Sequence, residues 1–101
     1  MSIKLKSTYL KELKRILHAN VPHAEVWAYG SRVRGDCHEG SDLDLVVHHP
    51  KNSNAHLSAL ANLKEAFINS TIPILIDVLG WSSLPQSMQD EISKAYVVIQ
   101  P

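Results

Sequence analysis

The run from Ile72 to Leu79, IPILIDVL, constrains this chain more than any other segment. It is almost continuously apolar, which makes it the strongest strand signal in the sequence. One charge, Asp77, interrupts the run. An unpaired carboxylate is costly to bury, so Asp77 must reach solvent, pair with a basic side chain or bind a metal ion. The segment therefore predicts a strand over residues 74–79 that carries a candidate functional residue.

Two more strands are predicted earlier in the chain. Residues 25–29 are β-branched and aromatic and run into Gly30, and residues 43–48 place apolar side chains at alternate positions. The final segment, residues 96–101, is expected to be extended.

Helical spacing of apolar residues predicts three helices that pack against these strands. The first begins at Ser7 and stops near Asn20, and the second follows a polar loop at 51–54 and continues to Ile68. The third lies between Pro85 and Ala95, after a Ser83–Gln86 pair with the spacing of a capping box. The predicted fold class is α+β, with one mixed sheet of at least three strands and helices packed on it.

Size and composition narrow the class of protein. The mass of 11.3 kDa suits one domain, and Gly and Pro are scattered rather than pooled into a linker, so residues 1–101 are expected to form a single domain. Leu, Ile, Val and Phe total 29 residues, enough for a packed core. The single cysteine, the lack of finger-like Cys and His spacing, and the absence of a membrane-length or signal-like apolar run predict a soluble cytoplasmic protein.

The net charge of zero conceals an asymmetry along the chain. Residues 1–34 carry seven Lys and Arg against two Glu, whereas residues 35–101 carry three against eight Asp and Glu. An acidic second half argues against direct binding of duplex DNA and suits a site that concentrates divalent cations.

The carboxylates of that half include a close pair, Asp42 and Asp44. Alternation along a strand places them on the same face, about 7 Å apart along the backbone. If Asp77 lies on a neighbouring strand, three anions roughly 5 Å apart repel by about 3 kcal/mol per pair at an effective dielectric constant near 20. A bound cation removes that penalty, and carboxylate oxygens suit Mg²⁺ together with substrate phosphates. The alternative is that two such aspartates are simply solvated strand-edge residues.

A second motif, Gly30-Ser31-Arg32, follows the first predicted strand. Its backbone amides, hydroxyl and guanidinium would meet at one rim and could hold phosphate. Alone, the motif also fits a strand-to-helix turn capped by Ser31, with Arg32 as an ordinary surface residue.

The combined pattern resembles the nucleotidyltransferases of polymerase β-like fold. Its parts are Gly30-Ser31-Arg32-Val33-Arg34-Gly35, then Ser41-Asp42-Leu43-Asp44-Leu45, then Asp77, within a resemblance that covers roughly residues 7–95. A single-domain chain of this length is similar to the minimal nucleotidyltransferases, small members of which are encoded beside HEPN-domain proteins as antitoxins.

The resemblance implies transfer of a nucleoside monophosphate, AMP from ATP, to an acceptor hydroxyl on two Mg²⁺ ions. Asp42 and Asp44 would bridge the two ions, and Asp77 would hold the acceptor-side ion and take the acceptor proton. Gly30 and Ser31 would bind the β- and γ-phosphates, Arg32 would neutralise them, and Ser41 would support the site from behind. These three aspartates are therefore the predicted catalytic and metal-binding residues.

The acceptor must come from elsewhere, because the chain has no room for an acceptor domain. Similarity to the minimal nucleotidyltransferases implies a HEPN-type ribonuclease toxin, silenced by AMP transfer. Two alternatives stay open: an antitoxin that masks its partner without catalysis, and a transferase acting on a small hydroxylated molecule.

Overall fold

The computed structural model describes residues 3–48 and 53–101, and over residues 53–57 only the course of the backbone. Its elements are, in chain order, α1 (Ser7–Asn20), β1 (Glu25–Tyr29), α2 (Ser31–Arg34), β2 (Leu43–His48), α3 (Ser53–Ile68), β3 (Ile76–Gly80), α4 (Gln86–Lys94) and β4 (Val97–Gln100). A short 3₁₀ helix, Trp81–Ser83, connects β3 with α4. Residues 51–52 of the predicted polar loop lie outside the described residues.

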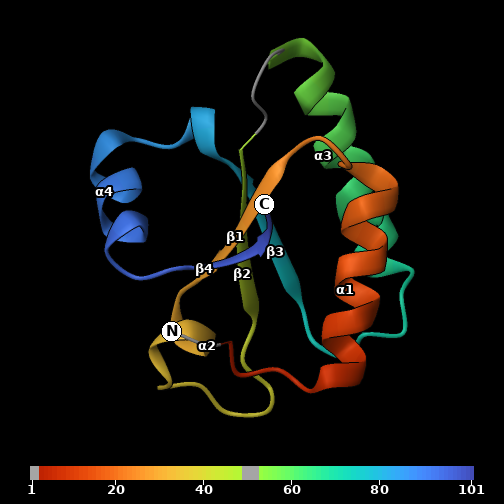
Figure 1. The fold of residues 1–101 in the computed structure, drawn as a ribbon, viewed down its shortest axis with the longest axis vertical. Coiled ribbons are helices and arrows are strands. Elements are labelled where there is room, and N and C mark those ends of the chain that lie inside the picture. The colour runs from red at the N-terminus through yellow and green to blue at the C-terminus, as the bar shows by residue number, and fades with distance from the viewer. Residues whose placement is uncertain (1–2, 49–52) are drawn as a thin grey trace.

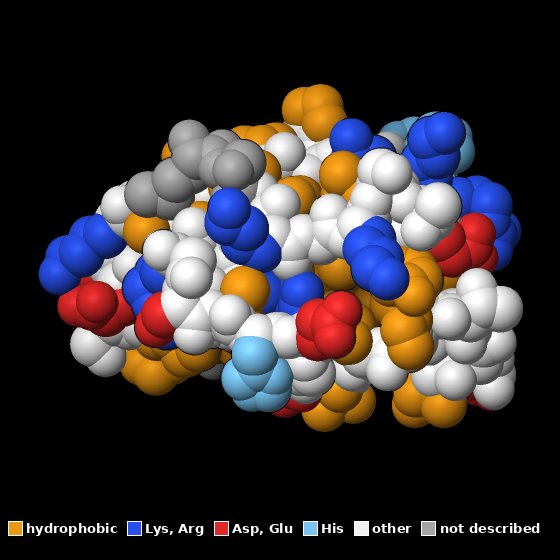
Figure 2. All heavy atoms as spheres, turned by 90° about the horizontal axis from the view of Figure 1, so that it is seen from below, with side chains coloured by type: hydrophobic (Ala, Val, Ile, Leu, Met, Phe, Trp, Pro, Cys, Tyr) orange, Lys and Arg blue, Asp and Glu red, His pale blue; other side chains and the backbone are white. Residues whose placement is uncertain are grey.

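One mixed sheet organises these elements in the order β3-β2-β1-β4. β1 is antiparallel to both β2 and β4, whereas β2 and β3 are parallel. Parallel neighbours need a crossover connection, and α3 supplies it. α1 and α3 lie on one side of the sheet and α4 on the other (Figure 1). Seen from the end that carries α2, Lys and Arg side chains are spread over the surface beside exposed hydrophobic ones (Figure 2).

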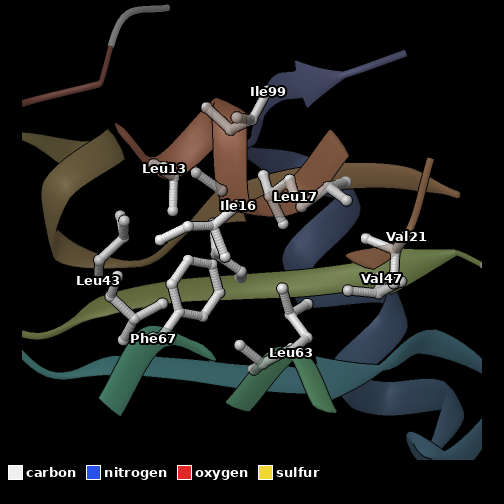
Figure 3. Packing of buried hydrophobic residues seen from close by; sticks show 14 of the residues in the cluster. Leu13, Ile16, Leu17, Val21, Leu43, Val47, Leu63, Phe67 and Ile99 are labelled. Atoms are coloured by element: carbon white, nitrogen blue, oxygen red, sulfur yellow. The ribbon is translucent and has the colours of Figure 1, made fainter. Parts of the chain in front are cut away.

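The hydrophobic core lies between the sheet and the α1–α3 layer. Leu13 and Leu17 of α1 and Phe67 of α3 point toward Leu43 and Val47 of β2 (Figure 3). Alternation along each strand sends every second side chain into this core. Burying these apolar side chains supplies the main favourable term in folding. The predicted α+β class, with helices packed on a mixed sheet, is confirmed.

The opposite face of the sheet is lined by aromatic and acidic side chains. Trp27 stacks on Tyr96 with 3.8 Å between ring centroids, and also contacts His48 and Trp81 at 4.1 and 5.4 Å. Trp27 therefore packs within an aromatic cluster, while Tyr29, at the next position on the same face, lies beside acidic residues.

Several element boundaries differ from the sequence-based expectations. The strand predicted over 74–79 begins at Ile76 and ends at Gly80, because its pairing with β2 runs from Ile76 opposite Leu43 to Gly80 opposite Val47. α3 already begins at Ser53, within the predicted loop. The capping-box prediction was wrong: the Ser83 hydroxyl donates to the Gly80 carbonyl at 2.9 Å, and Gln86 donates to Asp90 at 2.8 Å. Among the helices of the described ranges, none is long and apolar enough to cross a lipid bilayer.

Candidate active site

A row of polar side chains crosses one end of the sheet on its aromatic face. Asp44 of β2 is in register with Tyr29 of β1 on one side and with Asp77 of β3 on the other. Neighbouring strands are about 4.8 Å apart, so the backbones of Asp44 and Asp77 lie side by side. Asp42, in the loop that leads into β2, lies close enough to Asp44 for its charge to act on that carboxylate. We call Asp42, Asp44 and Asp77 the acid row.

Like charges crowd in the acid row and change its titration. Burial raises the pKa of Asp44, the nearby carboxylates of Asp77 and Asp42 raise it further, and the Arg34 guanidinium lowers it. Burial, together with the charges of Asp44 and Asp77, raises the pKa of Tyr29 to about 12. The acid row therefore has an excess of negative charge that a cation would neutralise.

Whether the acid row can hold a metal ion depends on how close its side chains lie to one another. In residues 3–48 and 53–101, no three His, Cys, Asp or Glu side chains stand close enough together to coordinate one ion. The three carboxylates thus lie near one end of the sheet without converging on one point. Their chemistry fits a divalent cation, because oxygen ligands are those that Mg²⁺ prefers and Asp44 is destabilised in its charged form by its neighbours.

Gly30 brings the backbone against this row where β1 ends. Its φ of +80° lies in the region that favours glycine. A Cβ atom added there would lie 2.5 Å from the Asp44 Oδ2 atom, so no larger residue fits without movement. The chain then turns into α2, with the Val33 and Arg34 amides donating to the Gly30 carbonyl, both at 3.0 Å. The turn sets Ser31 on the same cavity wall as Asp44.

A cleft of about 540 Å³ opens between this turn and α4. We call it the α2–α4 cleft. Its lining residues are Tyr29, Gly30, Ser31, Arg34 and Asp44 on the sheet side, and Met88, Glu91, Ile92, Lys94 and Ala95 on the α4 side. The volume lies within the range of small-molecule sites, roughly 300–1,000 Å³. Gly30, Ser31 and Asp44, which the sequence motifs singled out, therefore line one shared cavity.

Two basic residues of the cleft, Arg34 and Lys94, were given no role by the sequence-based reasoning. Arg34 lies close enough to Asp44 to lower its pKa, and Lys94 donates to Glu91 at 2.9 Å on the α4 wall. Arg34 is two positions from Arg32, and nothing in the sequence distinguishes which arginine faces the cleft. Lys94 lies outside every motif, and only the packing of α4 over this end of the sheet brings it to the cleft.

Arg32, predicted to contact phosphate, is placed elsewhere. Only 6% of it is exposed, and its guanidinium donates to backbone carbonyls, including that of Ser41. It borders a second cavity, of about 370 Å³, together with Leu5, Tyr9 and Ile74. Ser41 accepts a hydrogen bond from the His38 amide at 3.0 Å and so braces the loop before Asp42. The expected phosphate contact of Arg32 is therefore corrected: its donors are already engaged.

Comparison with known proteins gives consistent similarities. Residues 10–99 match the profile of the family described as nucleotidyltransferase domain. A curated relative from Haemophilus influenzae (strain Rd), named "Probable protein adenylyltransferase MntA", is 42% identical over 97% of this chain and 84% of its own.

Solved structures show the same fold at low sequence identity. A toxin–antitoxin complex with AMP-PNP matches with a TM-score of 0.64 and 17% identity, over 89% of this chain and 71% of that one. A complex of a tri-AMPylated Shewanella oneidensis HEPN toxin with an MNT antitoxin matches with a TM-score of 0.60 and 13% identity, over 94% and 71%.

Proposed function

The chain belongs to the nucleotidyltransferase domain family, and from this premise we propose that it transfers AMP from ATP to a hydroxyl group of a separately encoded HEPN-type toxin. The observation that carries the proposal is the register of Asp44 with Asp77, at the edge of a cleft large enough for a nucleotide. The 42% identical relative named as a protein adenylyltransferase supports the choice of AMP and of a protein acceptor. The matched complexes, one with AMP-PNP and one with an AMPylated HEPN toxin, are consistent with it.

Mg²⁺ is the proposed cofactor, with two ions held by Asp42, Asp44 and Asp77. The donor chemistry and the negative charge that crowds around Asp44 support this assignment. When bound, divalent cations neutralise charge on the transferred phosphoryl group and lower the pKa of the acceptor hydroxyl. The side chains of the acid row are then relieved of their mutual repulsion.

The sheet side of the α2–α4 cleft binds the triphosphate in this proposal. The Ser31 hydroxyl donates to a phosphate oxygen, and Gly30 allows the nucleotide to approach the backbone because it has no Cβ. Arg34 and Lys94, on opposite walls of the cleft, balance the phosphate charge. Ser41 supports Asp42 from the preceding loop.

The acceptor hydroxyl approaches from the open side of the row, where Asp77 is exposed on the edge strand β3. Its oxygen forms the new bond to the α-phosphorus, and pyrophosphate leaves with the electron pair of the broken P–O bond. The hydroxyl proton passes to Asp77, which needs only to lie within hydrogen-bonding reach of it. Transfer requires the oxygen about 3–3.5 Å from the α-phosphorus, a geometry that a docked protein side chain can hold.

The test incubates the purified chain with its HEPN-type partner, ATP and Mg²⁺, and measures the intact mass of the partner. We expect added AMP on the partner at substoichiometric amounts of this chain, and no addition with Asp42→Asn. The partner should remain inactive as a ribonuclease after this chain is removed.

Two outcomes would overturn the proposal. Recovery of full toxin activity after separation would favour an antitoxin that masks its partner without catalysis. AMP appearing on a small hydroxylated compound, with none on the protein, would favour a small-molecule transferase.

A further inference from the structure

The Arg32 guanidinium donates hydrogen bonds to the loop that leads into the acid row. Its Nε and Nη2 atoms donate to the Ser41 carbonyl at 3.0 and 2.8 Å, and Nη2 also donates to the Glu39 carbonyl at 2.9 Å. The Nη1 atom donates to the Lys4 carbonyl at 2.6 Å. Within the described residues, every hydrogen bond of this guanidinium goes to a neutral backbone acceptor.

These bonds tie together two segments far apart in sequence. The Lys4 amide donates back to the Arg32 carbonyl at 2.8 Å, so the N-terminal segment is held to α2 from both sides. Residues 36–42 contain no helix or strand, and their other hydrogen bonds, such as Ser41 to His38, are local. Arg32 is thus the anchor that holds the loop against the rest of the fold, one residue before Asp42.

We propose that Arg32 is a positioning residue that places Asp42 in the acid row by fixing the carbonyls of residues 39 and 41. This inference rests on the proposed function, in which Asp42 is one of the metal-binding residues. Asp44 and Asp77 are placed by strand pairing and need no such support. A lysine at position 32 would keep the charge, but its compact ammonium cannot span the same carbonyls as a planar guanidinium.

The second cavity gives a way to test this directly. It adjoins Arg32, and its other lining residues include Leu5, Tyr9, Glu39 and Pro73. Truncation to Ala should therefore leave a space that joins the cavity and can admit free guanidinium.

The experiment compares Arg32→Lys and Arg32→Ala with the wild type, using AMP transfer to the partner. Misplacing a reacting group by about 1 Å costs on the order of a hundredfold in rate. We expect kcat to fall by about that factor in both variants, with KM for ATP changed less than about threefold, because Arg32 does not reach the nucleotide. Added guanidinium should restore a large part of kcat to Arg32→Ala and none to Asp42→Asn.

Arg15→Ala is the matched control, because Arg15 is exposed and pairs only with Glu12 within the described residues. It should keep wild-type kcat and show no response to guanidinium. A rise in KM for ATP at unchanged kcat would overturn the proposal and restore a phosphate contact for Arg32. A folded Arg32→Ala protein that guanidinium fails to rescue would reduce the residue to a fold-stabilising one.

Amide hydrogen exchange separates failure of this inference from failure of the proposed function. If the wild type transfers no AMP, the proposed function fails, while exchange still reports on the loop. We then expect faster exchange of the His38 and Ser41 amides in Arg32→Lys, with the Asp44 and Val46 amides of β2 unchanged. If the loop amides were equally protected from exchange in the wild type and in Arg32→Lys, the positioning role would be wrong, even where Arg32→Ala does not fold.

Discussion

The two faces of the sheet are built by the same strands and differ in what their side chains do. On β2, Leu43, Leu45 and Val47 point into the α1–α3 core and are fully buried. Asp44, between them, points to the other face and meets the charge of Asp77. The core face stabilises the fold by burying apolar area, whereas the acid row costs stability through repulsion and desolvation. A single strand can therefore be mutated on one face for stability and on the other for activity.

The largest effect is expected from Asp44→Asn. It should lower the rate of AMP transfer by about a thousandfold or more, because in the proposed mechanism the lost charge holds cations at the transferred phosphoryl group. The melting temperature without metal should stay the same or rise, since repulsion within the acid row is relieved.

Transfer assays and thermal melts of Asp44→Asn and of Asp90→Asn, an exposed aspartate of α4, check this comparison. A steep fall in the melting temperature of Asp44→Asn would mean that the acid row is structural.

Leu45→Ala, one position away, should have the opposite effect: it should lower stability and leave ATP binding unchanged. Leu45 is fully buried in the core, and such truncations cost about 2–5 kcal/mol in the free energy of unfolding. ATP affinity should stay near the wild-type value where the protein is still folded. Urea denaturation and calorimetric titration measure the two quantities. A loss under about 1 kcal/mol would contradict the assignment of this face as the main source of stability.

Gly30→Ala should affect both properties to an intermediate extent. Its φ of +80° is strained for alanine, at a cost of about 1–3 kcal/mol, and the new Cβ would displace the Asp44 carboxylate. Gly35→Ala is the control, because its φ of +92° is also unfavourable but its Cβ would meet no described atom within 4 Å. Both variants should lose stability in denaturant titrations, and only Gly30→Ala should lose transfer activity. Equal activity in the two would show that contact with Asp44 is unimportant.

The smallest expected effect is a pH dependence of the metal-free protein. Because the pKa of Asp44 is raised above its ordinary value of 3.8, the folded protein keeps this proton at pH values where the unfolded chain has lost it. Stability due to Asp44 therefore increases as the pH falls through the window between the folded pKa and 3.8. Asp44→Asn lacks this gain, so its stability advantage should be largest at neutral pH and shrink on acidification. Unfolding titrations at decreasing pH measure it, and an advantage that grew would reverse the assigned cause.

Local pattern was enough for much of the fold. The strands at 25–29 and 43–48 have the predicted bounds, because alternation of apolar side chains follows directly from strand geometry. The helix predicted from Ser7 to Asn20 is α1 as expected. The beginning of β3 depended on pairing with β2, a strand distant in sequence, whereas the capping box at Ser83 failed because its hydroxyl bonds to the Gly80 carbonyl three residues earlier.

In the candidate site, too, some features follow from local sequence spacing and others depend on tertiary structure. The sequence alone predicted that Asp42 and Asp44 would lie close together, since the spacing of two residues is local, although Asp42 lies in the loop before β2 rather than on the strand. It also identified Asp77 as a candidate functional residue, because a charged side chain is unusual within an apolar strand. Strand order and register decided that Asp77 lies opposite Asp44 on the neighbouring strand. No local pattern encodes a register between segments about thirty residues apart.

The two arginines of the α2 turn show the limit most clearly. Arg32 and Arg34 have the same chemistry and differ by two positions, yet one is buried among the carbonyls before Asp42 and the other lines the α2–α4 cleft. The sequence determined that a guanidinium would lie near the acid row. Tertiary structure decided which one faces it, because the outcome depends on where Lys4, the loop of residues 38–41 and α4 come together in space.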